Sequence, residues 1–338
     1  MSGNETQKQA VVYSQSPEAN ELFLKAREYI ARSHPDTGGT LANAREAIKL
    51  YEQAVKADPK FARAFLEMSR AWVSLGYSEP DGITNKELLP HAKAAALKAV
   101  VLDQKMSAAH LALAGLYYSI EFDWEKAERE FKLALQLAPN SAYAHGSYAA
   151  YLGSMGRFDE GLAEANKADE LLPSQGADFD LARIHYDMHR YDEATAYLKR
   201  SLKKKGNMLG HFLLGFVYVA QQTFDEAIAE FKTAASISDN AGARLALAYG
   251  YAMGGKQDEA LKIFDELKTS HKGVNSVPYR VAAVYVALGD KDQAIELLKK
   301  DYEVQDNWMN QLKVDPVMDP LRSDPRFQVL LQTMKFKE

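Results

Sequence analysis

Apolar and small residues alternate with polar ones along this chain at the spacing of amphipathic helices. Between residues 208 and 238 the pattern predicts two such helices, joined by a short polar turn. The apolar stripe of the first helix contains His211, Leu214, Gly215 and Tyr218. The facing stripe of the second contains Ala227, Phe231 and Ala234. Because Gly215 and Ala227 are small, we expect the two helices to pack closely at this point.

The small residue of the second helix recurs through the whole chain. It is found at Ala47, Ala92, Ala127, Gly161, Ala194, Ala227, Ala260 and Ala294. From Ala127 onward the intervals are 34, 33, 33, 33 and 34 residues. A fixed period in this range is typical of stacked helix pairs, each of which buries its apolar face against its neighbours. The sequence therefore predicts an all-α solenoid of about eight repeats.

The regular pattern is interrupted in a few places. We expect inserted loops over residues 33–40 and 76–90, and the second accounts for the long interval between Ala47 and Ala92. Unit eight has Asp301 where a small residue is usual. The predicted organisation is a polar, disordered tail over residues 1–17, the solenoid over 18–304 and capping helices over 305–338.

The helix pairs resemble the tetratricopeptide repeat (TPR) over nearly the whole chain, which implies a right-handed α-solenoid. Residues 17–27 and 312–331 are also similar to the flanks of TPR regions found downstream of bacterial adenylate cyclase, winged-helix regulator and Ser/Thr kinase domains. In the closing segment, Asp-Pro pairs suit helix N-termini. Its apolar side chains are expected to cover the last repeat, as an array requires: Trp308, Leu321, Phe327, Leu330 and Leu331.

Composition narrows the functional classes. The net charge of −5, from 41 basic and 46 acidic residues, argues against nucleic acid as the main partner. There is no cysteine, which excludes zinc–thiolate sites, disulfides and thiol catalysis. The sequence has neither a bilayer-spanning apolar run nor a signal-peptide pattern at its start. We expect a cytoplasmic protein, with the periplasm as the alternative if the chain is part of a longer membrane regulator.

Few residues offer catalytic or metal-binding chemistry. Phosphate-binding glycine motifs are missing, so the chain lacks the cyclase and kinase modules of the resembled proteins and is a free-standing relative or a piece of a longer protein. His185 and His189, four residues apart, would bind a metal if Asp178 or Asp187 supplied a third ligand. The favoured interpretation is that His185 packs and His189 lies in a turn. We therefore expect no enzyme activity, no cofactor and no metal.

Two further polar sets have alternative explanations. Three histidines share the fourth position of a first helix, either as a pH-sensitive row or, as we favour, as packing residues: His110, His145 and His211. A basic run at the end of one second helix is either a solvated helix end, which we favour, or an anionic-ligand patch: Lys199, Arg200, Lys203, Lys204 and Lys205.

The TPR resemblance implies that first helices line a concave groove. The side chains that helical phase directs into it belong to Arg63, Leu66, Arg70, Leu111, Tyr118, Tyr143, Phe179, Arg183, Tyr186, Leu209, Phe212, Phe216, Leu245, Tyr249 and Tyr279. This row is aromatic and aliphatic with few arginines, unlike the basic sets that grip a terminal carboxylate. It suits a partner segment with apolar anchors.

We therefore expect a non-catalytic interaction or regulatory scaffold with a protein or peptide partner. Four other interpretations stay open. The aromatic row is the pocket of a small-molecule sensor, it packs within the protein, or the chain's own N-terminal tail fills the groove. The least favoured is an enzyme with an unrecognised site around His185 and Asp178. The sequence does not indicate an oligomeric state.

Overall fold

The computed structural model describes residues 13–32, 40–77, 84–173, 177–204, 207–238, 240–269 and 278–336. Within these ranges the protein is helical, without strands. The α-helices are α1 (Pro17–Ala31), α2 (Thr40–Ala57), α3 (Ala62–Tyr77), α4 (Asn85–Leu102), α5 (Ser107–Leu116), α6 (Trp124–Leu137), α7 (Ala142–Ser154), α8 (Phe158–Leu171), α9 (Asp178–Asp187), α10 (Tyr191–Lys204), α11 (Met208–Ala220), α12 (Phe224–Ile237), α13 (Ala241–Met253), α14 (Gln257–Thr269), α15 (Pro278–Ala287), α16 (Lys291–Val304) and α17 (Pro325–Thr333).

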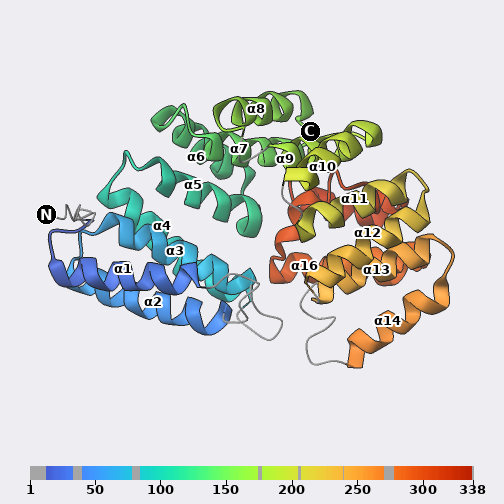
Figure 1. Ribbon diagram of the computed structural model, residues 1–338, viewed down its shortest axis with the longest axis horizontal. Coiled ribbons are helices and arrows are strands. Elements are labelled where there is room, and N and C mark those ends of the chain that lie inside the picture. Colours follow the sequence, from blue (N-terminus) through green and yellow to red (C-terminus); the bar gives the residue numbers. More distant parts are fainter. Residues whose placement is uncertain are drawn as a thin grey trace, which may run out of the picture.

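Consecutive helices pack as pairs, from α1 with α2 to α15 with α16, and the pairs follow one another around a curve (Figure 1). This arrangement confirms the predicted all-α solenoid and its paired repeats. The first helix of each pair also contacts the first helix of the next pair in several places, such as α7 with α9 and α13 with α15. None of the helices in the described part of the chain is both long and apolar enough to cross a bilayer.

Each second helix contains one of the recurring small residues, and all eight of these residues are buried. From the third pair onward, the residue five positions before each small residue lies in the turn between the two helices and adopts a left-handed conformation. These residues are Phe122, Gly156, His189, Gln222, Gly255 and Gly289. Only glycine adopts this conformation without steric cost. The turn therefore recurs with the same backbone geometry even where glycine is absent, because the packing of the two helices determines it.

Phe231 shows how small residues set the spacing between repeats. Its ring is fully buried between α11 and α13. A Cβ at Gly215 would lie 2.5 Å from Phe231 Cε1, and a Cβ at Gly250 would lie 2.7 Å from Phe231 Cδ2. The aromatic ring therefore occupies the space that two glycines leave on neighbouring first helices.

Replacing Gly215 by alanine is expected to destabilise the protein, although alanine favours helix by about 1 kcal/mol. The methyl group displaces the Phe231 ring, and overpacking of this kind costs about 1–3 kcal/mol. Gly115 is the matched control, because a Cβ there meets nothing within 4 Å. Urea denaturation should show Gly215→Ala less stable and Gly115→Ala at least as stable as the wild type; the reverse order would contradict the packing.

The inserted loops are shorter than predicted where the structure describes them. Residues 33–39 and 78–83 lie outside the described residues, but Thr40 begins α2 and Tyr77 ends α3. The prediction of a loop up to Pro90 was wrong, because α4 begins at Asn85 and contains that proline. The reason is a capping box in which Thr84 and Glu87 satisfy each other's backbone N–H groups ahead of the proline.

The end of the chain returns to the inner side of the curve instead of extending the array (Figure 1). After α16 it forms two short 3₁₀ helices, η4 (Asn307–Gln311) and η5 (Pro316–Leu321), and then α17. The Asn85 side-chain amide donates to the Gln305 carbonyl at 2.9 Å, and the Trp124 indole donates to the Met334 carbonyl at 2.7 Å. The last repeat is therefore joined to the second and third, and Leu321, Phe327 and Leu330 are buried in the process.

Candidate functional site

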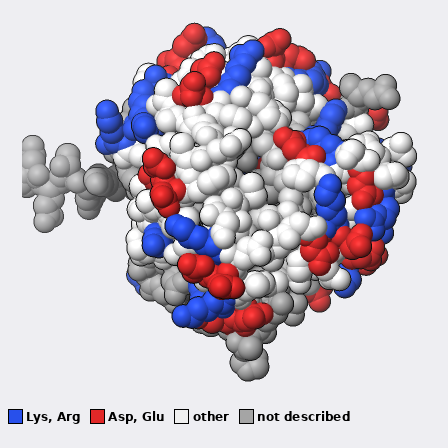
Figure 2. Space-filling model, turned by 90° about the vertical axis from the view of Figure 1, so that its right-hand side faces the viewer, with Lys and Arg blue, Asp and Glu red and all other residues white. Residues whose placement is uncertain are grey.

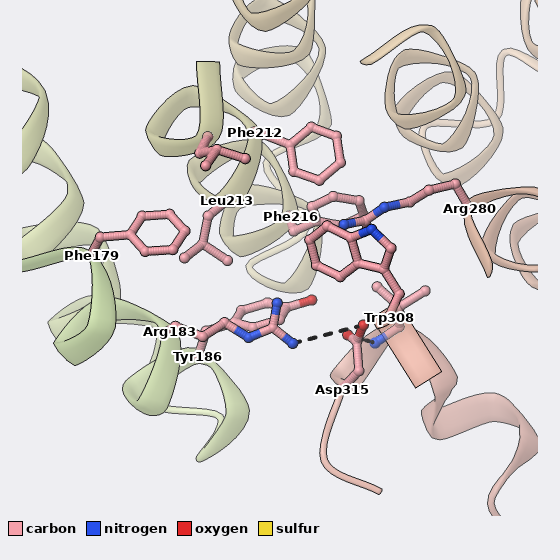
Figure 3. A pocket seen from close by; sticks show the side chains of 11 residues that line it. Phe179, Arg183, Tyr186, Phe212, Leu213, Phe216, Arg280, Trp308 and Asp315 are labelled. Atoms are coloured by element: carbon pink, nitrogen blue, oxygen red, sulfur yellow. Dashed lines mark hydrogen bonds and ion pairs between the residues drawn. The ribbon is translucent and has the colours of Figure 1, made fainter. Parts of the chain in front are cut away.

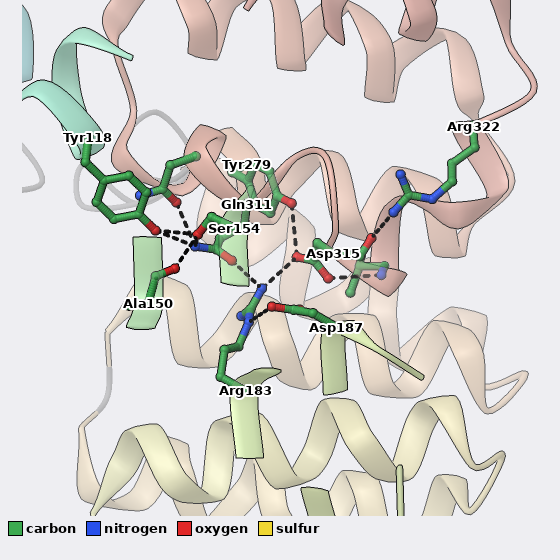
Figure 4. Close-up of polar contacts among 11 residues, drawn as sticks. Tyr118, Ala150, Ser154, Arg183, Asp187, Tyr279, Gln311, Asp315 and Arg322 are labelled. Atoms are coloured by element: carbon green, nitrogen blue, oxygen red, sulfur yellow. Dashed lines mark hydrogen bonds and ion pairs between the residues drawn. The ribbon is translucent and has the colours of Figure 1, made fainter. Parts of the chain in front are cut away.

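The concave face is crossed by residues 306–321, which we call the inner segment. Gln311 lies at its centre (Figure 4). The Gln311 side-chain N–H donates to Tyr118 Oη at 3.0 Å and to Ser154 Oγ at 2.7 Å, while Gln311 Oε1 accepts from Arg183 at 3.2 Å. One glutamine thus connects three first helices, because Tyr118 belongs to the π-helix η2 (Tyr117–Glu121) that continues α5. The chain's own C-terminal part therefore occupies this portion of the groove, whereas the alternative left open by the sequence was the N-terminal tail, of which residues 1–12 lie outside the described residues.

Asp315 connects the inner segment to the later repeats. Its Oδ2 accepts a hydrogen bond from Tyr279 at 3.0 Å and lies 4.0 Å from Arg183 Nη2. Arg183 also donates to Asp187 at 3.1 Å. Buried ion pairs of this kind are weak evidence for net stability, but losing one partner leaves the other charge uncompensated. The polar contacts therefore set the register of the segment on the face.

The predicted groove residues fall into four groups, the last of which is exposed to solvent. On α3, Arg63 and Arg70 pair with Glu67 at 2.9 and 3.2 Å and remain partly exposed. Tyr118, Arg183 and half-buried Phe179 lie beside the inner segment or its pocket. The third group is buried: Leu66, Leu111, Tyr186, Phe212, Phe216, Leu245, Tyr249 and Tyr279. Their expected exposure was wrong, because packing against neighbouring helices and the returning C-terminal part removes them from solvent.

Only two large apolar residues of the predicted row are open to solvent. Tyr143 on α7 is 67% exposed, and Leu209 on α11 is 48% exposed. Both lie in the first turn of a first helix, and Leu209 also lines the pocket that Trp308 of the inner segment shares. The open part of the concave face therefore runs across the N-terminal ends of α7, α9 and α11.

Arg280 is a central residue that the sequence analysis missed. Its guanidinium lies 4.0 Å from the centroid of the Trp308 ring and 4.4 Å from that of Phe212 (Figure 3). Burial lowers the pKa of Arg280 to about 10, so the group stays charged at neutral pH. The aromatic faces stabilise this charge by cation–π contacts. The signal in the sequence was a single arginine in an otherwise apolar helix, α15.

The pocket beside Arg280 is small. Phe179, Phe212 and Trp308 line it, and its cavity volume is about 20 Å³, enough for about one water molecule. Small-molecule sites usually measure about 300–1,000 Å³. The aromatic row is therefore packed against the inner segment and does not form a pocket for a small molecule in this conformation.

Each histidine of the row contacts a side chain of the second helix in its own repeat. Each imidazole Nδ1 lies 2.5–2.7 Å from a glutamate of the second helix: His110 with Glu130, His145 with Glu164 and His211 with Glu230. In two other repeats the position of the histidine is occupied by Arg244, which pairs with Glu266, and by Asp178, which pairs with Arg200. In the second of these pairs the first helix supplies the acidic residue and the second helix the basic one. The position thus forms a polar contact within the repeat, whether or not its residue is a histidine.

The proposed metal pair is not brought together. α9 ends at Asp187, so His189 lies in the left-handed turn, where its Nε2 is 2.8 Å from Asp319. His185 stacks on Tyr197 within the core. Among the described residues no group of three or more histidine, aspartate or glutamate side chains has metal-ligand geometry. Asp178, the other candidate ligand on α9, accepts a hydrogen bond from Arg200.

Charge is distributed without a dominant sign on the side of the molecule drawn in Figure 2. Basic and acidic side chains mix around a broad neutral surface. In the basic run, Arg200 pairs with Asp178 and Lys199 lies over the Tyr218 ring, while Lys205 falls outside the described residues. Nucleic-acid binding surfaces need clustered basic side chains, whereas basic and acidic side chains are interspersed on this side.

Comparisons with known proteins agree with this architecture. Residues 179–242 match the family model of the tetratricopeptide repeat. A search of curated protein sequences found no match. Among solved structures, a Rap protein complexed with Competence and Sporulation Factor has a TM-score of 0.61 at 15% identity, covering 93% of this chain and 98% of that one.

Two further structures resemble the chain. Yeast Tom70 has a TM-score of 0.57 at 16% identity and covers 96% of this chain and 69% of its own. PilW, a type IV pilus biogenesis factor, has a TM-score of 0.51 at 21% identity and covers 62% of this chain and 96% of its own. At these identities the likeness establishes a shared fold.

Proposed function

We propose that this tetratricopeptide-repeat protein is an interaction scaffold that binds a partner segment on the open part of its concave face, beside the inner segment. The supporting observation is the inner segment itself. It shows that the face accommodates a non-helical stretch and short 3₁₀ turns through apolar anchors, such as Met309 and Leu312, together with side-chain amide and carboxylate contacts. The neighbouring open surface offers Tyr143 and Leu209 as anchors of the same kind. Exposed aromatic and aliphatic side chains on a rigid face are typical of binding surfaces.

The solved relatives support a scaffold role more generally. The Rap protein was solved as a complex with Competence and Sporulation Factor, and it matches nearly the full length of both chains. In the groove, Arg183 donates to Asp187 and Tyr279 donates to Asp315, so these polar side chains serve contacts within the protein. Residues 17–27 and 312–331 resemble the flanks of TPR regions in bacterial regulators. This resemblance favours a regulatory role in a bacterial signalling protein.

The proposal predicts that Tyr143→Ser combined with Leu209→Ser lowers retention of a specific partner at least about tenfold, the effect of losing about 1.4 kcal/mol of binding free energy. The measurement is quantitative mass spectrometry of proteins retained from native cells by the immobilised full chain. Val101→Ser on α4 is the control, because Val101 is 69% exposed and far from these two helices in the array. Equal retention of every protein by the double variant and the control would contradict the proposal.

A further inference from the structure

A second, larger cavity lies between α7, the end of α8 and the start of α9. Its volume is about 310 Å³, within the range of ligand sites. Its lining includes Tyr143, Ser147 and Ala150 of α7. Their helical spacing places them on the same face of α7 as Ser154, which accepts a hydrogen bond from Gln311 of the inner segment. The cavity therefore continues the surface that already holds a segment of chain.

The walls of this cavity are mostly apolar and small, with one acidic group. Gly146, Ala150 and Ala168 leave the space open, and the ring of Tyr143 lies at its exposed rim. Asp180 of α9 is the one charged residue among the described residues that line it. A Cβ at Gly146 would lie 3.3 Å from Asp180 Oδ2, so the glycine makes room for the carboxylate.

Asp180 has no compensating partner within the described part of the protein. No hydrogen bond or ion pair joins its carboxylate to another described residue. Burial raises the pKa of Asp180 to about 6, and no charge of another described residue offsets this shift. The neighbouring Asp178, by contrast, is bonded to Arg200. A half-buried carboxylate without a partner is energetically unfavourable and remains available to a cation.

We propose that this cavity binds a basic side chain, lysine or arginine, of the partner segment; the inference rests on the proposed function. The ammonium or guanidinium group would pair with Asp180, and the methylene stem would lie against the alanines, as long basic side chains do on apolar surface. The Tyr143 ring adds a cation–π contact at the rim. The recognition is thus opposite in charge to one that grips a carboxylate.

A random-peptide display library, selected on the full-length protein, tests this directly. We expect one position of the selected peptides to be enriched in lysine or arginine. In a soluble peptide, replacing that residue by norleucine should lower affinity at least about tenfold, measured by calorimetry. The Asp180→Asn protein should bind the original peptide as weakly as the wild-type protein binds the norleucine peptide. It should bind the norleucine peptide no more weakly than that, as expected when the basic residue and Asp180 contact each other.

Two variants serve as controls. Asp159→Asn removes the same charge from the first turn of α8, where Asp159 is exposed, and should leave both affinities unchanged. Ser147→Leu fills the cavity while keeping Asp180 and should abolish the preference for the basic residue. Circular dichroism establishes that each variant is folded.

The possible failures are distinguishable. Peptides that require Tyr143 and Leu209 but no basic residue would overturn this inference and leave the proposed function standing. A basic residue that contributes equally with Asp180→Asn would likewise overturn it. A protein that selects no peptide at all would overturn the proposed function, and this inference with it.

Discussion

Replacing Asp301 by alanine is expected to stabilise the protein at pH 7 by about 2–4 kcal/mol. Asp301 is fully buried, and neither carboxylate oxygen has a hydrogen-bond partner. Burial, and then the nearby Asp306, raises its pKa to about 9. At pH 7 the folded protein must therefore hold a proton that the unfolded chain releases, and this difference costs stability.

The effect has a defined pH dependence. Because the folded pKa of Asp301 lies above the unfolded value near 4, the folded state binds the additional proton between pH 4 and 9. Wild-type stability should fall as pH rises through this window, and the alanine variant should lose that slope. Urea denaturation at pH 5 and pH 8 measures both effects. Glu303→Ala, an exposed residue on the same helix, is the control; an Asp301→Ala protein that is less stable at pH 8 would contradict the assignment.

Asp301 lies where the array closes on itself. The adjacent Tyr302 stacks on Phe122 with 6.0 Å between ring centroids, and Gln305 accepts a hydrogen bond from Asn85. In the other repeats a small residue is usual at the position of Asp301. The stability gained by the alanine variant should therefore strengthen the junction between the last repeat and the second and third.

Replacing Leu312 by alanine is expected to destabilise the protein by about 2–5 kcal/mol, the usual cost of truncating a buried leucine. Leu312 is fully buried and lies between Gln311 and Lys313, which contact three first helices between them. The loss should loosen the inner segment as a whole. Hydrogen exchange should accelerate in α7, α9 and α15, which the segment contacts, and remain unchanged in α1 and α2.

Val329→Ala is the matched control for this prediction. Val329 lies on α17 and is 60% exposed, so its truncation should change stability by less than about 0.5 kcal/mol. If Leu312→Ala were equally harmless, or if exchange rose uniformly along the array, the inner segment would not be held on the concave face as described.

The repeat architecture was predictable because its signals are local. A recurring small residue marks the second helix of each pair, and all eight of these residues are buried as helical phase predicts. Packing of one pair requires only side chains within about 35 residues of each other in the sequence. Helical phase also predicted that Tyr143 and Leu209 point out of the helix pair, and both side chains are exposed to solvent.

The candidate site was much less predictable, because distant residues build it. Helical phase shows which face Phe212 or Tyr279 occupies, but it does not show what covers that face. Gln311 reaches Tyr118 across 193 residues of sequence, and Asn85 reaches Gln305 across 220. No periodic signal encodes such contacts, so the closing segment was interpreted as a cap for the last repeat only.

The sequence by itself determined the helix pairs, their register and the order in which they stack, since each depends on residues close together in the chain. The tertiary structure decided which groove residues remain open, because the curvature of the array brings residues 306–321 onto its inner side. It also placed Asp180 beside Gly146 and Arg280 beside Trp308. Burial and charge compensation depend on such neighbours, and long-range folding alone determines them.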